Sequence, residues 1–128
     1  MTNIEIVQEL YRAFAAKDYA AFTRLSAPDL EWVQNEGFPR GAAHHGPQAV
    51  IDGVFKAFAD VWESFSFETE RMLDAGDTVI VIGAYEGRHR ATGKAFRSAA
   101  AHVYELKNGK LVRYRQFADT KVIWDAMG

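Results

Sequence analysis

The chain has 128 residues, of which 48% are hydrophobic and 25% are charged, and its formal net charge is −2. This length and balance predict one domain over residues 1–128, and the weak negative charge gives no general attraction to nucleic acid or acidic membranes. Cysteine is absent, which excludes disulfides, thiolate metal sites and cysteine nucleophiles.

Helical patterns dominate the first half of the chain. Thr2 and Glu5 form a capping-box pattern ahead of an apolar stripe with helical spacing. Asp18 is a typical N-cap for a second helix, which has to end before Pro28. Pro47 suits the first position of a third helix, and apolar residues cover so much of its circumference that we expect it to be largely buried. These patterns predict helices over residues 3–16, 19–26 and 47–62.

Strand patterns dominate the second half. A short apolar segment, Leu30–Gln34, is typical of a first strand and precedes a glycine-containing loop over residues 35–46. From Phe65 onward apolar residues alternate, as in half-buried strands, and Asn108-Gly109 is a strong hairpin signal. Helices followed by strands define an α+β fold class with an antiparallel meander. We predict its strands over residues 65–73, 78–90, 94–106 and 111–118, followed by a last short helix.

Several short segments carry a family resemblance. They are residues 11–18 (YRAFAAKD), 27–32 (APDLEW), 46–50 (GPQAV) and 74–79 (DAGDTV), and residues 102–104 (HVY) followed by 108–112 (NGKLV). In this order they resemble the nuclear transport factor 2-like fold, and more narrowly the SnoaL-like polyketide cyclases and the relatives of ketosteroid isomerase. The resemblance implies a cone-shaped, cystatin-like α+β fold, in which three N-terminal helices pack on a curved, mainly antiparallel sheet. It also implies an apolar pocket at one end of the cone.

The resemblance also identifies catalytic positions, and several are vacant here. In ketosteroid isomerase two pocket carboxyls have different tasks. The general base falls on Gln34, whose amide cannot accept a proton, and the protonated aspartate falls on Ala101. The oxyanion tyrosine falls on Leu10, and Tyr11 is rotated by ~100° around the helix from that position. We therefore do not expect standard ketosteroid isomerase activity.

The SnoaL-like cyclases give a closer match. Their histidine corresponds to His102, but their proton-transfer aspartate corresponds to Gln116. Limonene-type epoxide hydrolases use an aspartate at the same last-strand position, together with an arginine and an aspartate that correspond here to Gly83 and Tyr85. The water-activating set of that enzyme is therefore absent.

These positions predict a pocket between the third helix and the sheet. Among its residues only His102 has an ordinary pKa near neutrality, so it is the candidate general acid or base. The alternative is a buried histidine with satisfied hydrogen bonds, and strand parity leaves open which face His102 occupies. Gln34 and Gln116 are expected to orient a ligand by hydrogen bonds. The predicted ligand-binding residues around His102 are Trp32, Gln34, Phe55, Phe58, Tyr85 and Gln116.

No metal or cofactor is expected. His44 and His45 are adjacent on the predicted loop, but no acid stands at helical ligand spacing from them, and the zincin pattern is absent. We interpret them as residues at the rim of the pocket mouth. Phosphate-loop and Rossmann glycine patterns are also absent.

Two function classes remain open. The first is a protein with a pocket for a hydrophobic, oxygenated molecule that resembles a steroid, polyketide or terpenoid. Such a protein either binds this ligand or performs cyclase-, isomerase- or hydratase-like proton transfer through His102. The second is a non-catalytic dimeric interaction module, whose pocket is filled by its own side chains: Trp32, Phe55, Phe58, Trp62 and Phe117.

Location and assembly are also expectations. The first nine residues carry two acids and no base, and no apolar run is long enough to cross a bilayer, so we expect a cytoplasmic protein without a membrane partner. Arginines on one face of the last strand are compatible with pairing through the sheet. We expect a homodimer, because a two-fold symmetric pair is the commonest oligomer.

Overall fold

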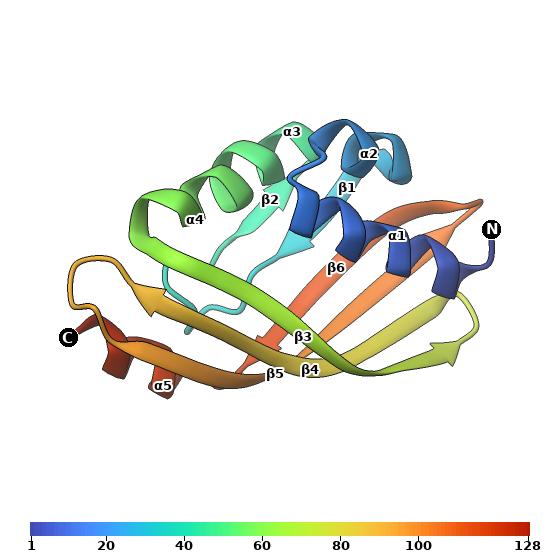
Figure 1. Cartoon of the computed structure of the whole chain (residues 1–128). Helices are drawn as coiled ribbons and strands as arrows, with labels where there is room; N and C mark the ends of the chain where they lie inside the picture. The colour runs from blue at the N-terminus through green and yellow to red at the C-terminus, as the bar shows by residue number, and fades with distance from the viewer.

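A computed structural model describes all residues 1–128 and shows a curved sheet with the helices of the first half of the chain over one side of it (Figure 1). The helices are α1 (Asn3–Ala16), α2 (Tyr19–Leu25), α3 (Pro47–Val50), α4 (Lys56–Val61) and α5 (Thr120–Met127), with a π-helical turn, η1 (Ile51–Phe55), between α3 and α4. The strands are β1 (Ser26–Val33), β2 (Ala43–His45), β3 (Trp62–Ala75), β4 (Thr78–His89), β5 (Ala95–Lys107) and β6 (Lys110–Ala118). No helix is both long and apolar enough to span a membrane.

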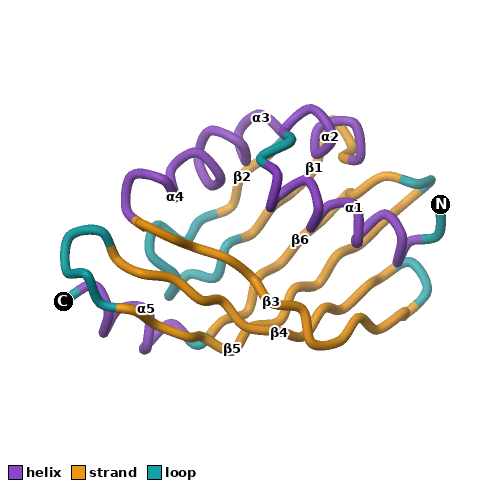
Figure 2. The backbone as a smooth tube through the Cα atoms, in the orientation of Figure 1, coloured by secondary structure: helices purple, strands orange, loops and turns teal.

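The six strands form a single sheet in the order β2-β1-β6-β5-β4-β3. The predicted meander is confirmed, because β3, β4, β5 and β6 pair antiparallel with their chain neighbours. The strand β1 pairs parallel with β6, and this pairing brings the first strand beside the last. Figure 2 shows α1 to α4 gathered over one face of these strands, with the chain termini at opposite ends of the molecule.

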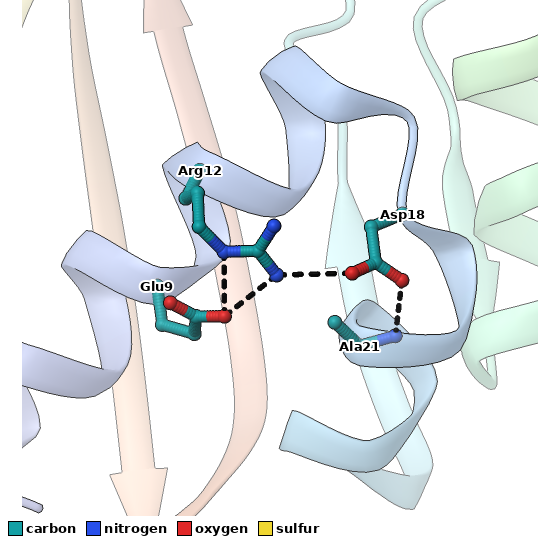
Figure 3. Close-up of polar contacts among 4 residues, drawn as sticks. All are labelled: Glu9, Arg12, Asp18 and Ala21. Atoms are coloured by element: carbon teal, nitrogen blue, oxygen red, sulfur yellow. Dashed lines mark hydrogen bonds and ion pairs between the residues drawn. The ribbon is translucent and has the colours of Figure 1, made fainter.

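The junction between α1 and α2 follows the predicted caps. Thr2 accepts a hydrogen bond from the Glu5 amide at 3.1 Å, and Asp18 accepts one from the Ala21 amide at 3.1 Å. The Arg12 guanidinium donates to Asp18 at 3.0 Å and also pairs with Glu9 (Figure 3). These contacts fix the end of α1 relative to α2, and they thereby set which α1 residues face the sheet.

The third predicted helix, over residues 47–62, needs correction. It is divided into α3, η1 and α4, so there are four N-terminal helices rather than three, and Trp62 already begins β3. Val50, Ile51 and Val54 are buried as expected, but α4 contains no buried residue. The extra residue of the π turn shifts the apolar stripe, and Phe58 is only partly buried, against both hydrophobic clusters of the interior.

Two strand predictions also change. The strand β1 begins at Ser26, earlier than predicted, because the parallel ladder with β6 already starts at Ser26 and Leu111. The strand β2 lies within the predicted loop; it is a three-residue strand that exists only by pairing with β1. Such a short pairing leaves no periodic pattern in the sequence.

The faces of the sheet are distinguished by burial. On β5 the inner row includes Ser98, Ala100, His102 and Tyr104, while Arg97 and Ala99 point outward and are exposed. This settles the strand parity, and it places His102 on the concave face. On β6 Gln116 is buried and Phe117 is 45% exposed on the outer face. Phe117 therefore cannot fill the interior, contrary to the expectation for a self-filled pocket.

Candidate functional site

A chain of buried hydrogen bonds crosses the concave interior. His102 contacts two tyrosine hydroxyls: Nδ1 lies 2.5 Å from Tyr11, and Nε2 lies 2.6 Å from Tyr85. Gln116 donates its amide N–H to the Tyr85 hydroxyl at 2.7 Å and accepts the backbone N–H of Asn35 at 3.1 Å. Residues from α1, β4, β5 and β6 and from the segment after β1 therefore share one polar network inside an aromatic core.

The Asn35 amide fixes the direction of every proton in this network. A backbone N–H only donates, so Gln116 Oε1 faces Asn35 and Gln116 Nε2 faces Tyr85. Tyr85 then directs its own proton at His102 Nε2, which lies 2.6 Å from the tyrosine hydroxyl. A neutral imidazole carries one proton, so His102 Nδ1–H donates to Tyr11. The Tyr11 hydroxyl keeps its own proton for a further acceptor, and the neighbouring Tyr104 hydroxyl is buried without another partner.

Burial also sets the ionisation of this network. His102 is 4% exposed, and removal from water lowers its pKa to about 3, so the ring is neutral at physiological pH. Burial raises the pKa of Tyr85 to about 12, and it also raises the pKa of Tyr11. Phe67 covers the ring of His102 at a centroid distance of 4.3 Å. The network is therefore uncharged.

Trp32 and Gln34 point the same way, as predicted from alternation along a strand. The Trp32 indole N–H donates to Gln34 Oε1 at 2.9 Å, and both side chains are buried. An indole nitrogen cannot accept, so Gln34 keeps its oxygen toward Trp32. The Gln34 Nε2 group takes part in no hydrogen bond of the protein and is available as a donor.

Gln34 lines a cavity of about 370 Å³ between α4, the segment after β1 and α5, which we call the Gln34 cavity. Its walls are mainly apolar, with polar groups contributed by Gln34, Arg40 and His89. His89 Nδ1 lies 3.2 Å from Thr92 Oγ1 and 3.3 Å from the Thr92 amide nitrogen. The apolar lining is formed by Pro39, Val54, Ala57, Phe58, Val61, Trp62, Trp124 and Met127, with Gly53.

The structure distributes the predicted site residues over three places. Gln34 and Phe58 line the Gln34 cavity, while Phe55 lines a different cavity that Phe58 also borders. Neither cavity is lined by the other four, which lie buried in the interior: Trp32, Tyr85, His102 and Gln116. Tyr85, His102 and Gln116 share the hydrogen-bond network. The network and the cavity are thus separate features.

Several site residues escaped the sequence reasoning. Tyr11 is rotated from the family's tyrosine position, yet its hydroxyl reaches His102 across the core. The position of Tyr11 in the apolar stripe of α1 indicates that its side chain faces the core. Asn35 acts through its backbone amide, which no sequence pattern reports. Trp124 lies beyond the family motifs and is held at the cavity by donating its indole N–H to Gly37 at 2.7 Å.

The histidine pair lies apart from these features. His44 is on β2 and packs against Gly53 of η1, and its Nε2 atom is buried without a hydrogen-bond partner. His45 is exposed. No three His, Asp or Glu side chains gather as a potential metal site.

The helices, the six-stranded curved sheet and the aromatic interior define a nuclear transport factor 2-like fold. A crystal structure of such a protein from Burkholderia thailandensis is 36% identical, with a TM-score of 0.95 over 100% of this chain and 98% of that chain. The SnoaL-like domain profile matches residues 7–114, so the chain belongs to the SnoaL-like family. No curated protein matched the sequence.

More distant structures share the fold. TerC, co-crystallised with polyporic acid, is 24% identical, with a TM-score of 0.86 over 98% of this chain and 97% of that chain. IdmH of Streptomyces antibioticus, a candidate polyketide cyclase, is 16% identical, with a TM-score of 0.82 over 100% of this chain and 99% of that chain. At these identities the likeness shows the architecture alone.

Proposed function

We propose that the protein binds a hydrophobic, oxygenated small molecule in the Gln34 cavity. The observation that carries this proposal is the fixed orientation of Gln34, whose oxygen is engaged by Trp32 while its amide N–H groups remain free. This amide group opens into the cavity, where a carbonyl or phenolate oxygen of a ligand can accept its hydrogen bond. The orientation of Gln34 therefore suits recognition of a ligand oxygen that accepts a hydrogen bond.

The rest of the cavity supports the same ligand chemistry. His89 adds a second polar group, and Arg40, which forms no ion pair, adds positive charge at the edge of the cavity. Trp62 and Trp124 offer aromatic surface to a ring system. Donors surrounded by apolar walls fit polyketide-, steroid- or terpenoid-like molecules with carbonyl groups. The co-crystallisation of TerC with polyporic acid makes that compound a suitable first test ligand.

Of the two functions, ligand binding without turnover is the one that the geometry favours. Both ring nitrogens of His102 are occupied by tyrosine hydroxyls, and the lowered pKa makes the imidazole a weak base. Proton transfer remains a second candidate because of one observation: an imidazole between two hydroxyls can pass a proton by exchanging its tautomers without becoming charged. His102→Gln would separate the two, since it should abolish turnover in an enzyme.

The experiment is ligand titration by calorimetry and by tryptophan fluorescence, against polyporic acid and panels of steroids, polyketides and terpenoids. Gln34→Glu keeps the acceptor for Trp32 but replaces the free donor by a carboxylate, so we expect at least about tenfold weaker binding of a carbonyl ligand. Gln8→Glu, on the exposed face of α1, is the matched control and should bind normally. Equal binding by both variants would refute the assignment of the site.

A non-catalytic interaction module is the remaining alternative. The interior is indeed rich in aromatic contacts, such as Phe38 and Phe65 against Tyr85 at 5.9 and 5.1 Å. Two cavities nevertheless remain beside Phe58. If no member of the ligand panels binds, the interaction module becomes the better interpretation.

A further inference from the structure

A second cavity shares Phe58 and Trp62 with the Gln34 cavity. It has a volume of about 480 Å³ and is bounded by the end of α1, by η1 and α4, and by the start of β3; we call it the α1–α4 groove. Its apolar surface is mostly aromatic and comes from Phe14, Tyr19, Phe55, Phe58, Trp62 and Phe65. This volume is in the range of sites that hold small organic molecules.

The charge around the groove differs from the charge of the whole chain. Lys17, Lys56 and Arg90 line it, and Glu63 is its only acidic residue. The local balance is therefore positive, although the chain carries a net charge of −2. Positive groups beside an apolar wall favour a ligand that has both a negative charge and an apolar body.

The three cations are held in different ways. Arg90 donates to the carbonyls of Ala59 at 3.1 Å and Trp62 at 3.2 Å, so it fastens the end of α4 as well as charging the groove. Lys56 lies 3.6 Å from Asp52, with its ammonium 5.8 Å above the ring centre of Tyr19. Lys17, at the end of α1, has no acidic partner. Lys17 is thus unpaired, and Lys56 has only an exposed pair with Asp52, which an anion in the groove can replace.

We propose that the α1–α4 groove binds an amphipathic monoanion, a carboxylate that carries an apolar chain or ring. Lys17 and Lys56 contact the carboxylate, and the aromatic side chains hold the apolar part. This site does not depend on the proposed function of the Gln34 cavity. The two cavities share Phe58 and Trp62, but their polar groups are different, so substitutions of polar residues separate them.

The test compares three probes with the same apolar chain, each below its micelle concentration: laurate, dodecanol and dodecyltrimethylammonium. We expect laurate to bind most tightly in calorimetric titrations and to lose affinity as salt is raised, because exposed charges are screened. Lys17→Glu/Lys56→Glu should weaken laurate binding by about tenfold or more. Lys17→Gln/Lys56→Gln, a milder change, should weaken it by about threefold or more.

The control is Lys107→Glu/Lys121→Glu, which makes the same change of charge at exposed positions outside the groove. This control should lose only the small amount of laurate affinity expected from the change in overall charge. Gln34→Glu should also bind laurate normally. The proposal is overturned if laurate does not bind, if dodecanol binds equally well, or if the control loses as much affinity as the groove variant. Thermal unfolding of each variant verifies that it is folded.

Discussion

His102 Nε2 lies 2.6 Å from the hydroxyl of Tyr85, and the proton between them belongs to the tyrosine. Gln116 donates its amide N–H to the Tyr85 oxygen at 2.7 Å, which directs the Tyr85 proton away from Gln116 and toward His102. A main-chain amide at Asn35 thus determines the tautomer of a histidine that it does not touch. The same arrangement leaves no room for a second proton on His102, because Nε2 is the acceptor that Tyr85 requires.

The first prediction concerns stability in acid. His102 resists protonation in the folded state, with its pKa lowered to about 3, but regains its ordinary value near 6.5 when unfolded. Between these values the unfolded state binds more protons, so stability falls as pH decreases below about 6.5, by up to about 1.4 kcal/mol per pH unit. Urea unfolding of the wild type and of His102→Gln from pH 7.5 to 4.5 measures this. A parallel decline in both proteins would contradict the assignment.

The second prediction reverses the hydrogen-bond network. Gln116→Glu places an ionised carboxylate that only accepts, so Tyr85 would turn its proton toward residue 116 and accept from His102 Nε2–H instead. The proton should therefore move from Nδ1 to Nε2, which ¹⁵N NMR of the imidazole detects directly at a pH where the carboxylate is ionised. Gln34→Glu makes the same chemical change outside the network and should leave the tautomer unaltered. An Nδ1 proton in both variants would show that Asn35 does not set the direction.

The local elements were predictable because their signals are local. The capping box at Thr2 and Glu5 is present, and Asn108 and Gly109 adopt positive φ angles of 52° and 77°, as their hairpin requires. The alternation along β6 is likewise regular, with Arg115 exposed and Gln116 buried. Such features depend on neighbours in the chain, so one sequence is sufficient to find them.

The site depended on contacts that one sequence does not encode. Tyr11 and His102 are 91 residues apart, and the stripe of α1 shows only that Tyr11 faces the core, not which strand it meets. The aligned positions suggested Gln34 and Gln116 as a pair, but Gln34 contacts Trp32 while Gln116 contacts Asn35 and Tyr85. The π turn and β2 likewise arise from tertiary packing.

The third prediction concerns Gly53 in the π turn. A Cβ atom at this position would lie 2.8 Å from His44 Cε1, closer than packed atoms tolerate. Gly53→Ala should therefore destabilise the protein by about 1–2 kcal/mol, since the clash outweighs the helical preference for alanine. Urea unfolding measures the change.

A double-mutant cycle provides the control for this clash. In the His44→Ala background the ring is absent, so Gly53→Ala should become neutral or stabilising by up to about 1 kcal/mol. The same loss in both backgrounds would mean that His44 is not the obstacle. In that case a backbone change in η1 would have to explain the effect.

The last prediction concerns assembly through the outer face of the sheet. Ile82, Ala99, Ala101 and Phe117 lie together around a shallow hollow there, beside Arg97, which pairs with Glu68 and Glu86. An apolar patch with a charged border is typical of an interface, and a two-fold pair would bury it against its own copy. We therefore propose a homodimer, with Phe117 near its centre. Light scattering at micromolar concentration should give twice the mass of one chain.

Phe117→Glu should convert this dimer to a monomer, because each copy would place a carboxylate against the apolar patch of the other. Trp124→Glu changes an equally exposed aromatic residue on α5 and should remain dimeric. A wild-type mass of one chain would exclude the dimer. A dimer that persists in Phe117→Glu, or that is lost equally in Trp124→Glu, would move the interface away from this face of the sheet.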